Sequence, residues 1–432
     1  MTGIFRFADF ELDGRSRELK KRGQRLRVQQ QPLQILAMLV AAPGDVVTRD
    51  ELRERIWGPS THVDFDRAIN KAITRLRQLL GDDLARPRFI ETLPKRGYRF
   101  VADVTRLASR RQIKDDAKEA YLKARHFWNK RTPDDLKRSI EYFHRAIERD
   151  PDYPLAWTGL ADAHTMIGIF GLRPPSEVFP PAKAAAERAL ALDESLAEGH
   201  TVLAEIQKLY DWNWDAAERS YRHALELDPG YAVAHQWYAQ LLSVLGRHDE
   251  AQAEMEAARR CDPLSPAIAV FFSFIACEAR RYDAAVAAGH DALELDANAP
   301  LTHYVLGRAY AKAGNTANAI AALEKGISLA GWFPAMEGAL GYVYARAGAR
   351  PRAEQILATL RHRRLTQYVS PIDLAQVCLG LGDADGTMAL LEEGYRSHAV
   401  RMMIIGDPFF SELGSDARYR DLMARLHLPI QP

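Results

Sequence analysis

The feature that most constrains the fold is a repeat of about 34 residues in the later part of the 432-residue chain. Six helix-stop dipeptides recur along it, separated by 43, 35, 34, 34 and 34 residues: Asp150-Pro151, Asp193-Glu194, Asp228-Pro229, Asp262-Pro263, Asp296-Ala297 and Ala330-Gly331. This period is typical of a helix–turn–helix unit, which buries its apolar surface only by stacking on its neighbours. The sequence therefore predicts an array of stacked helix pairs.

Small and bulky residues alternate inside each unit in a fixed order. Leu306-Gly307, Tyr310, Gly314 and Ala319 are followed one period later by Leu340-Gly341, Tyr344, Gly348 and Ala353. Small residues let paired helices approach, and the large ones fill the space between pairs. The pattern resembles the tetratricopeptide (TPR) family. About seven units are expected between residues 120 and 368, then a degenerate pair around 370–397 and a capping helix near 415–426.

The resemblance implies an all-α superhelical solenoid in which the first helix of each pair lines a concave groove. In this register the candidate groove residues are Thr201, Glu205, Gln236, Gln240, Phe274, Tyr304, Arg308 and Tyr342. They would meet a protein partner or a small-molecule ligand, or form a polar face that binds nothing. The Pro-rich stretch 170–181 is expected to be a loop, and Trp212 and Trp214 in the segment YDWNWDAAE are expected to be packing residues.

Charge is divided unevenly along the chain. Residues 1–112 carry 23 Lys and Arg against 14 Asp and Glu, a net +9, whereas the rest carries 35 against 43, a net −8. A basic module attached to an acidic one is typical of a nucleic-acid-binding domain joined to a domain that does not bind nucleic acid.

The first hundred residues alternate between strand and helix patterns. Phe5, Phe7, Phe10 and Leu12, then a turn at Asp13-Gly14 and residues 26–28, predict short strands. Helices are expected over 31–42, over 49–57 with Thr48 and Glu51 as a capping box, and over 66–80. Residues 88–93 and 97–101 predict a hairpin whose tip is Pro94-Lys95-Arg96.

The segment INKAITRLRQLLGDDLARPRFIETLPKRGYRF, residues 69–100, resembles the recognition helix and wing of OmpR/PhoB-type winged-helix regulators, especially the bacterial CadC- and ToxR-like branch. The resemblance extends over about Ile4 to Val104. It implies an α+β winged helix-turn-helix domain that binds double-stranded promoter DNA. No receiver domain precedes it in the sequence, and no membrane span follows it in residues 103–120.

The third helix has the chemistry for reading DNA. A helix fits the major groove, where arginine bonds guanine bidentately and lysine or threonine reaches other base edges. The outward candidates on 66–80 are Arg67, Asn70, Lys71, Thr74, Arg75 and Arg77, with Arg77 expected on phosphate. Lys95 and Arg96 in the wing, residues 94–99, would meet the adjacent minor groove. Loop 57–65 resembles the loop that touches RNA polymerase in this family, or is simply exposed.

The sequence thus predicts a winged helix over 1–104, a linker over 105–118 and a TPR array over 119–428. It shows no catalytic constellation, no cofactor motif and no metal-ligand spacing, and Cys261, Cys277 and Cys378 are isolated. A cytoplasmic regulator that is not an enzyme is therefore expected, with a homodimer on spaced half-sites as one route to useful affinity. The alternative is a TPR adaptor whose winged helix makes protein contacts.

Overall fold

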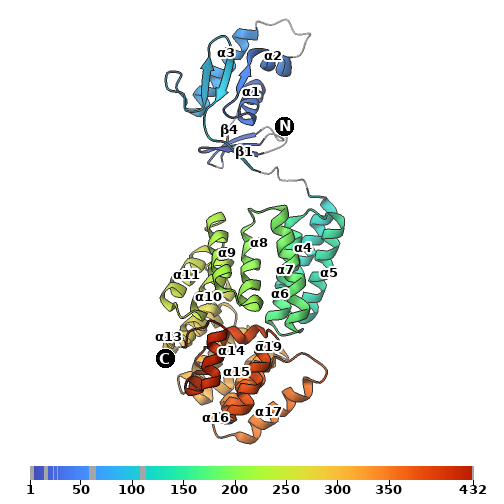
Figure 1. Ribbon diagram of the computed structural model, residues 1–432, viewed down its shortest axis with the longest axis vertical. Helices are drawn as coiled ribbons and strands as arrows, with labels where there is room; N and C mark the ends of the chain where they lie inside the picture. Colours follow the sequence, from blue (N-terminus) through green and yellow to red (C-terminus); the bar gives the residue numbers. More distant parts are fainter. Residues whose placement is uncertain are drawn as a thin grey trace. The chain divides into compact units, whose positions relative to one another are not determined.

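The computed structural model describes residues 4–13, 18–22, 24–26, 28–57, 65–107, 113–331 and 333–430. The chain divides into two compact units, Met1–Gln112 and Ile113–Pro432 (Figure 1). Each unit has a hydrophobic core of its own, so each is described by itself.

Antiparallel strands in the order β4–β3–β2–β1–β8 form the first sheet of the N-terminal unit. They are β1 (Ile4–Phe7), β2 (Phe10–Asp13), β3 (Glu18–Lys21), β4 (Gln24–Leu26) and β8 (Thr105–Leu107). Alternate side chains along a strand point to the same face, which buries Phe5, Phe7, Phe10, Leu12 and Leu19 together. An additional reversal, not predicted from the sequence, occurs at Ala8, where φ is +45°.

Three helices and a second sheet complete this unit. The helices are α1 (Gln30–Ala41), α2 (Arg49–Trp57) and α3 (Phe65–Leu80), and the sheet has the order β5–β7–β6, from β5 (Val46–Thr48), β6 (Ile90–Leu93) and β7 (Gly97–Phe100). The predicted capping box begins α2, because the backbone N–H of Thr48 donates to Glu51 Oε2 at 2.7 Å and the N–H of Glu51 donates to Thr48 Oγ1 at 3.2 Å.

The second unit is built from consecutive antiparallel helix pairs (Figure 1). In chain order these are α4 (Asp115–Lys130) with α5 (Pro133–Arg149), α6 (Pro154–Ile169) with α7 (Pro175–Leu192), α8 (Ala197–Ile206) with α9 (Trp214–Leu227), α10 (Ala232–Val244) with α11 (His248–Cys261), α12 (Pro266–Glu278) with α13 (Tyr282–Leu295), α14 (Pro300–Lys312) with α15 (Thr316–Ala330), α16 (Pro334–Arg346) with α17 (Arg350–Arg363), and α18 (Pro371–Gly380) with α19 (Ala384–Arg396). A π-helical turn, η1 (Gln207–Asp211), extends α8. The solenoid and its unit count agree with the sequence prediction.

The expected Pro-rich loop is shorter than predicted. Residues 170–174 connect the helices, but α7 already begins at Pro175 and contains Pro180 and Pro181. Proline is well tolerated in the first turn of a helix and removes a backbone donor further in. Val178 and Phe179, directly before these two prolines, are buried, and their burial stabilises the helix.

The array does not stay open at its C-terminal end. The 3-10 helices η2 (Val400–Ile404) and η3 (Ser411–Ser415) and the helix α20 (Ala417–Arg425) follow α19. Residues of η2 and of the turn before η3 lie against the first helices of several pairs, and Phe409 and Phe410 are fully buried. The C-terminal segment therefore fills the inner face instead of only capping the last pair.

The connection between the units is also shorter than the predicted linker 105–118. Thr105–Leu107 pairs with β1 as an edge strand of the first sheet, and α4 begins at Asp115. Over the ranges the structure describes, none of the helices combines the length and apolar character needed to cross a membrane.

Candidate DNA interface and repeat face

Helix α3 has one buried face and one exposed face. Ile69, Ala72, Ile73, Leu76 and Leu80 recur at three- and four-residue spacing and pack into the core of the unit. The predicted contact residues Arg67, Asn70, Lys71, Thr74 and Arg75 are all exposed on the other side. The helix therefore presents a continuous polar strip rich in cations.

A hydrogen-bond cluster holds the first half of this strip. Arg49 at the start of α2 donates from Nη1 to Asp66 Oδ1 at 2.7 Å, and from Nη2 to Asn70 Oδ1 at 3.0 Å and to the Tyr98 hydroxyl at 2.9 Å. The Tyr98 hydroxyl donates to the same Asn70 oxygen at 2.7 Å. This arrangement leaves the Asn70 amide NH2 as the group that can donate outward.

Sequence reasoning missed Arg49, although a signal was present. A cation in the first turn of a helix is electrostatically unfavourable, since the N-terminus carries the positive end of the helix dipole. An arginine at that position therefore indicates partners in other elements, here α3 and β7. Burial raises the pKa of Tyr98, which keeps its hydroxyl protonated and able to donate.

Arg77 is placed differently from the other candidates. It is half-buried, and its Nη2 donates to the backbone oxygen of Ile90 at 2.7 Å and to Thr92 Oγ1 at 2.8 Å. These bonds join α3 to the first strand of the hairpin.

Asp82 holds the segment that leads into that strand. Its carboxylate accepts hydrogen bonds from the backbone N–H groups of Arg88 at 2.6 Å and Ile90 at 2.8 Å.

The tip of the hairpin is narrow and basic. The N–H of Arg96 donates to the oxygen of Leu93 at 3.0 Å, Lys95 adopts a left-handed φ of +63°, and both side chains are exposed. Gly97 is required at the base of the turn, because a Cβ atom there would lie 2.1 Å from the backbone oxygen of Val47. The turn thus holds Lys95 and Arg96 at the end of a rigid ribbon.

The loop that resembles the RNA polymerase contact of this family cannot be described in full. Its residues 58–64 lie outside the described residues.

In the repeats, the predicted groove residues lie on the first helices of successive pairs, and most of them are buried. Thr201 Oγ1 donates to the oxygen of Ala197 at 2.8 Å. Lys208, a fully buried residue that the sequence did not single out, donates to Glu205 Oε1 at 2.6 Å and to Gln240 Oε1 at 2.7 Å. Gln236 is 5% exposed. The chain's own polar groups therefore satisfy much of this part of the face.

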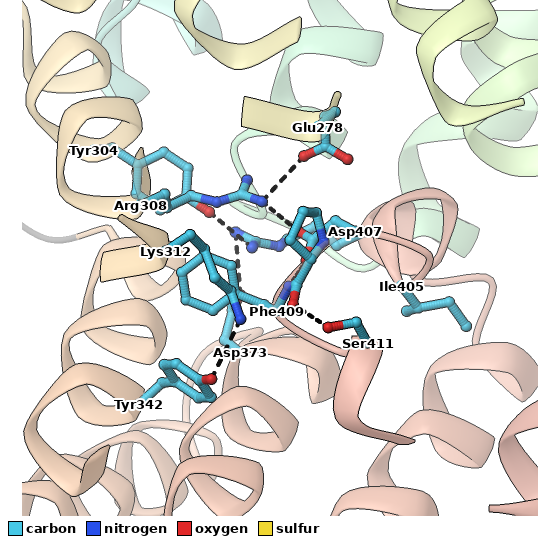
Figure 2. A network of polar contacts seen from close by, with 12 residues as sticks. Glu278, Tyr304, Arg308, Lys312, Tyr342, Asp373, Ile405, Asp407, Phe409 and Ser411 are labelled. Atoms are coloured by element: carbon cyan, nitrogen blue, oxygen red, sulfur yellow. Dashed lines mark hydrogen bonds and ion pairs between the residues drawn. The ribbon is translucent and has the colours of Figure 1, made fainter. Parts of the chain in front are cut away.

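The C-terminal segment covers the second part of the inner face. Figure 2 shows the guanidinium of Arg308 between the carboxylates of Glu278 and Asp407. Burial, with the neighbouring Asp407 carboxylate, raises the pKa of Glu278. Asp407 makes the closer contact with the guanidinium of Arg308.

Aromatic groove residues contact the same segment. The Tyr342 ring lies 4.9 Å from that of Phe409, the Tyr304 hydroxyl accepts from Arg401 Nη2 at 2.9 Å, and Phe274 lies under the Arg308 guanidinium. These groove positions are occupied by the chain itself. No periodicity of the sequence links residue 308 to residue 407. The sequence therefore could not predict that the C-terminal segment covers the groove residues.

The parts of the chain that the structure describes contain no group of three or more His, Cys, Asp or Glu side chains suited to a metal ion. Burial raises the pKa of both Glu278 and Asp373, and the neighbouring arginines, Arg308 and Arg401, only partly oppose that rise. Burial therefore accounts for these shifts without a metal ion.

Comparison with known families agrees with this geometry. Residues 23–100 match the family described as transcriptional regulatory protein, C terminal. The N-terminal unit is an OmpR/PhoB-type winged helix. Residues 212–269 and 302–331 match tetratricopeptide repeat families, so the second unit of this winged-helix protein is a TPR array.

Two similar curated proteins each match only part of this chain. The chain is 40% identical over 74 residues to the cholera toxin homolog transcriptional activator of Vibrio parahaemolyticus, which covers 17% of this chain and 25% of that protein. It is 34% identical over 70 residues to the cholera toxin transcriptional activator of Vibrio cholerae, covering 16% and 24%. The matched part spans about a quarter of these relatives.

Two similar solved structures cover different shares of the chain. A tetratricopeptide repeat protein from Parabacteroides merdae has 15% identity and a TM-score of 0.43, covering 62% of this chain and all of that one. The Klebsiella pneumoniae RstA DNA-binding domain, solved in complex with the RstA box, has 28% identity and a TM-score of 0.21, covering 23% and 96%.

Proposed function

We propose that this winged-helix/TPR protein is a sequence-specific transcription regulator of the bacterial cytoplasm that binds double-stranded promoter DNA. Helix α3 lies in the major groove, and the wing 94–99 reaches the adjacent minor groove. The observation that carries the proposal is the exposed strip of α3, with Lys71, Thr74 and Arg75 on one face, beside the basic tip Lys95-Arg96. That combination matches what a recognition helix and a minor-groove cation require.

The roles divide by chemistry. Lys71, Thr74 and Arg75 are exposed and contact base edges, whereas Arg67 and the wing cations contact phosphates or the minor groove. Asn70 donates its amide NH2 to a base acceptor while Arg49 and Tyr98 hold its oxygen. Arg77 orients the wing relative to α3 through Ile90 and Thr92, and its charge supports nearby phosphate.

The TPR array receives the signal or the partner that decides when the winged helix acts. TPR solenoids stack into large surfaces, and this one belongs to a chain whose DNA-binding unit is small. A single winged helix makes few contacts, so a partner held by the array or a homodimer on spaced half-sites supplies further affinity.

The test is selection of bound sites from a random DNA library with the full chain, followed by measurement of affinity against salt. We expect a defined site, bound at least a thousandfold more tightly than unrelated DNA. We also expect affinity for both kinds of DNA to fall steeply as salt rises. Binding with no sequence preference would contradict specific regulation, and no DNA binding would favour a TPR adaptor.

A further inference from the structure

The inner surface of the array closes on itself along a seam, where early and late repeats meet. The Trp212 ring stacks on His398 at 4.6 Å and on Tyr395 at 5.3 Å, and Trp214 Nε1 donates to the oxygen of Leu426 at 2.7 Å. The two tryptophans of the segment YDWNWDAAE therefore join the third repeat to the C-terminal segment.

A cavity of about 980 Å³ lies on the same seam. One wall comes from the first two repeats, between Pro133 and Val178, and the other comes from residues 364–369 between α17 and α18. Its volume is in the range of small-molecule sites in proteins. A molecule bound there would touch two parts of the chain that are separated by almost the whole array.

The cavity walls are apolar and basic. Ile140, Ile167 and Val178 from the early repeats and Val369 from the late wall supply aliphatic surface. Lys137, Arg173 and Arg364 are the cations, and Glu177 is the one carboxylate among the described lining residues. Glu177 is paired with Arg173 at 3.3 Å, while Lys137 and Arg364 pair with carboxylates that do not line the cavity, Asp134 at 3.6 Å and Glu393. The described lining itself therefore holds three cations against one carboxylate, a net positive charge.

We propose that this seam cavity binds a small amphipathic carboxylate, with its carboxylate near Lys137 and Arg173 and its apolar body against the aliphatic walls. The inference rests on the proposed function, because such a ligand would be what the array senses. A carboxylate suits the net positive walls, and an apolar body suits the isoleucines and valines.

Binding would hold the two walls together. A ligand that contacts both early and late repeats stabilises the closed array relative to forms in which the seam is open. The stacked Trp212 ring and the bond from Trp214 lie on the same seam, so they provide a readout of closure.

The test is isothermal titration calorimetry of the full chain with octanoate, using acetate and octylammonium as comparison probes. We expect one octanoate per chain, bound at least tenfold more tightly than acetate, and no measurable binding of octylammonium. The tryptophan emission should also change on saturation with octanoate. Equal binding of octylammonium, or no octanoate binding, would overturn the proposal.

Matched variants locate the site. The Lys137→Gln/Arg173→Gln double variant should weaken octanoate binding at least tenfold, whereas Arg260→Gln/Lys325→Gln, which removes two exposed cations elsewhere in the array, should leave it unchanged. Equal binding by both double variants would place octanoate outside the cavity. Circular dichroism checks that both variants are folded.

DNA affinity measured on the same samples separates this inference from the proposed function. Specific DNA binding without octanoate binding overturns only the seam site. Octanoate binding without specific DNA binding overturns only the assignment as a regulator.

Discussion

Lys71 and Arg75 lie one helical turn apart on the exposed face of α3, and the buried stripe around Ile73 fixes their direction. Their substitution therefore tests contacts with DNA and not the fold. Surface substitutions away from special features usually change stability by less than about 0.5 kcal/mol.

We expect Lys71→Ala and Arg75→Ala each to weaken binding to the selected site by about 1–3 kcal/mol and to relax preference at one base pair. Fluorescence anisotropy with single-base variants of the site measures both effects. Lys20→Ala, which removes a lysine from β3 in the other sheet, is the control. If both α3 variants bind like the parent chain, the assigned face is wrong.

The burial of His164 predicts that the stability of the repeat array depends on pH. Burial, with a smaller effect of His144, lowers the pKa of His164 to about 4, whereas a histidine in the unfolded chain titrates near 6.5. Between these values the unfolded chain binds more protons, so stability is lost as pH falls through this window. The free energy of unfolding should fall by about 1–2 kcal/mol between pH 7.5 and pH 5 from this group alone.

Chemical denaturation of the full chain at several pH values measures this effect. His164→Gln should reduce the change in the free energy of unfolding between pH 7.5 and pH 5. His126→Gln, at an exposed position, should leave that change as it is in the parent chain. An unchanged slope in His164→Gln would contradict the protonation argument.

Residue positions could be predicted where local periodicity decides them. The exposed set on α3 follows from the spacing of Ile69, Ile73 and Leu76. The bonds of Arg77 to the hairpin and of Arg308 to Asp407 join residues 13 and 99 positions apart, and a single sequence carries no record of such pairings.

At the scale of elements, the hairpin β6–β7 is held at both ends. Asp82 accepts backbone N–H groups at its entry, and Gly97 passes close to Val47 at its base. The tip cations are therefore carried by a ribbon with little freedom, which lowers the entropy lost when they meet DNA.

We expect Arg96→Ala to reduce affinity for specific and unrelated DNA alike and to lower the slope of log affinity against log salt by about one. Binding isotherms at several salt concentrations give the slope. Lys325→Ala removes a charge from α15 and is the control. A slope equal to that of the parent chain would remove the wing from the interface.

Helices and strands were predicted well where the hydrophobic period is long and poorly where it is short. The pairs from α4 to α17 follow from the 34-residue spacing, α1 and α3 from apolar stripes, and α2 from its capping box. The three-residue strands β5 and β8 carry too few residues for a pattern, and they form because β7 and β1 offer free edges.

At the scale of the whole molecule, the chain consists of two units with separate cores. The surface proposed to read DNA lies entirely in residues 1–112. The N-terminal unit should therefore bind DNA by itself, without the repeats.

Residues 1–112 alone should bind the selected site with an affinity within about tenfold of that of the full chain. The difference would be the affinity that a second copy or a partner held by the repeats supplies. Promoter output in cells should nevertheless differ between the two. Anisotropy and a reporter fused to the selected promoter make the comparison. Equal affinity together with equal output would mean that the repeats contribute nothing to regulation.

Closure of the array also limits how the protein can change in length. An open solenoid gains or loses a repeat at modest cost, because each repeat touches only its neighbours. Here Trp214 must reach Leu426 and Arg308 must reach Asp407. Removal of any pair from α10 to α19 would break the first contact, and removal of a pair after α15 would break both. Insertions or deletions of whole repeats between the third and the last should therefore be rare among proteins that keep this seam, and variation in length should fall in the loops.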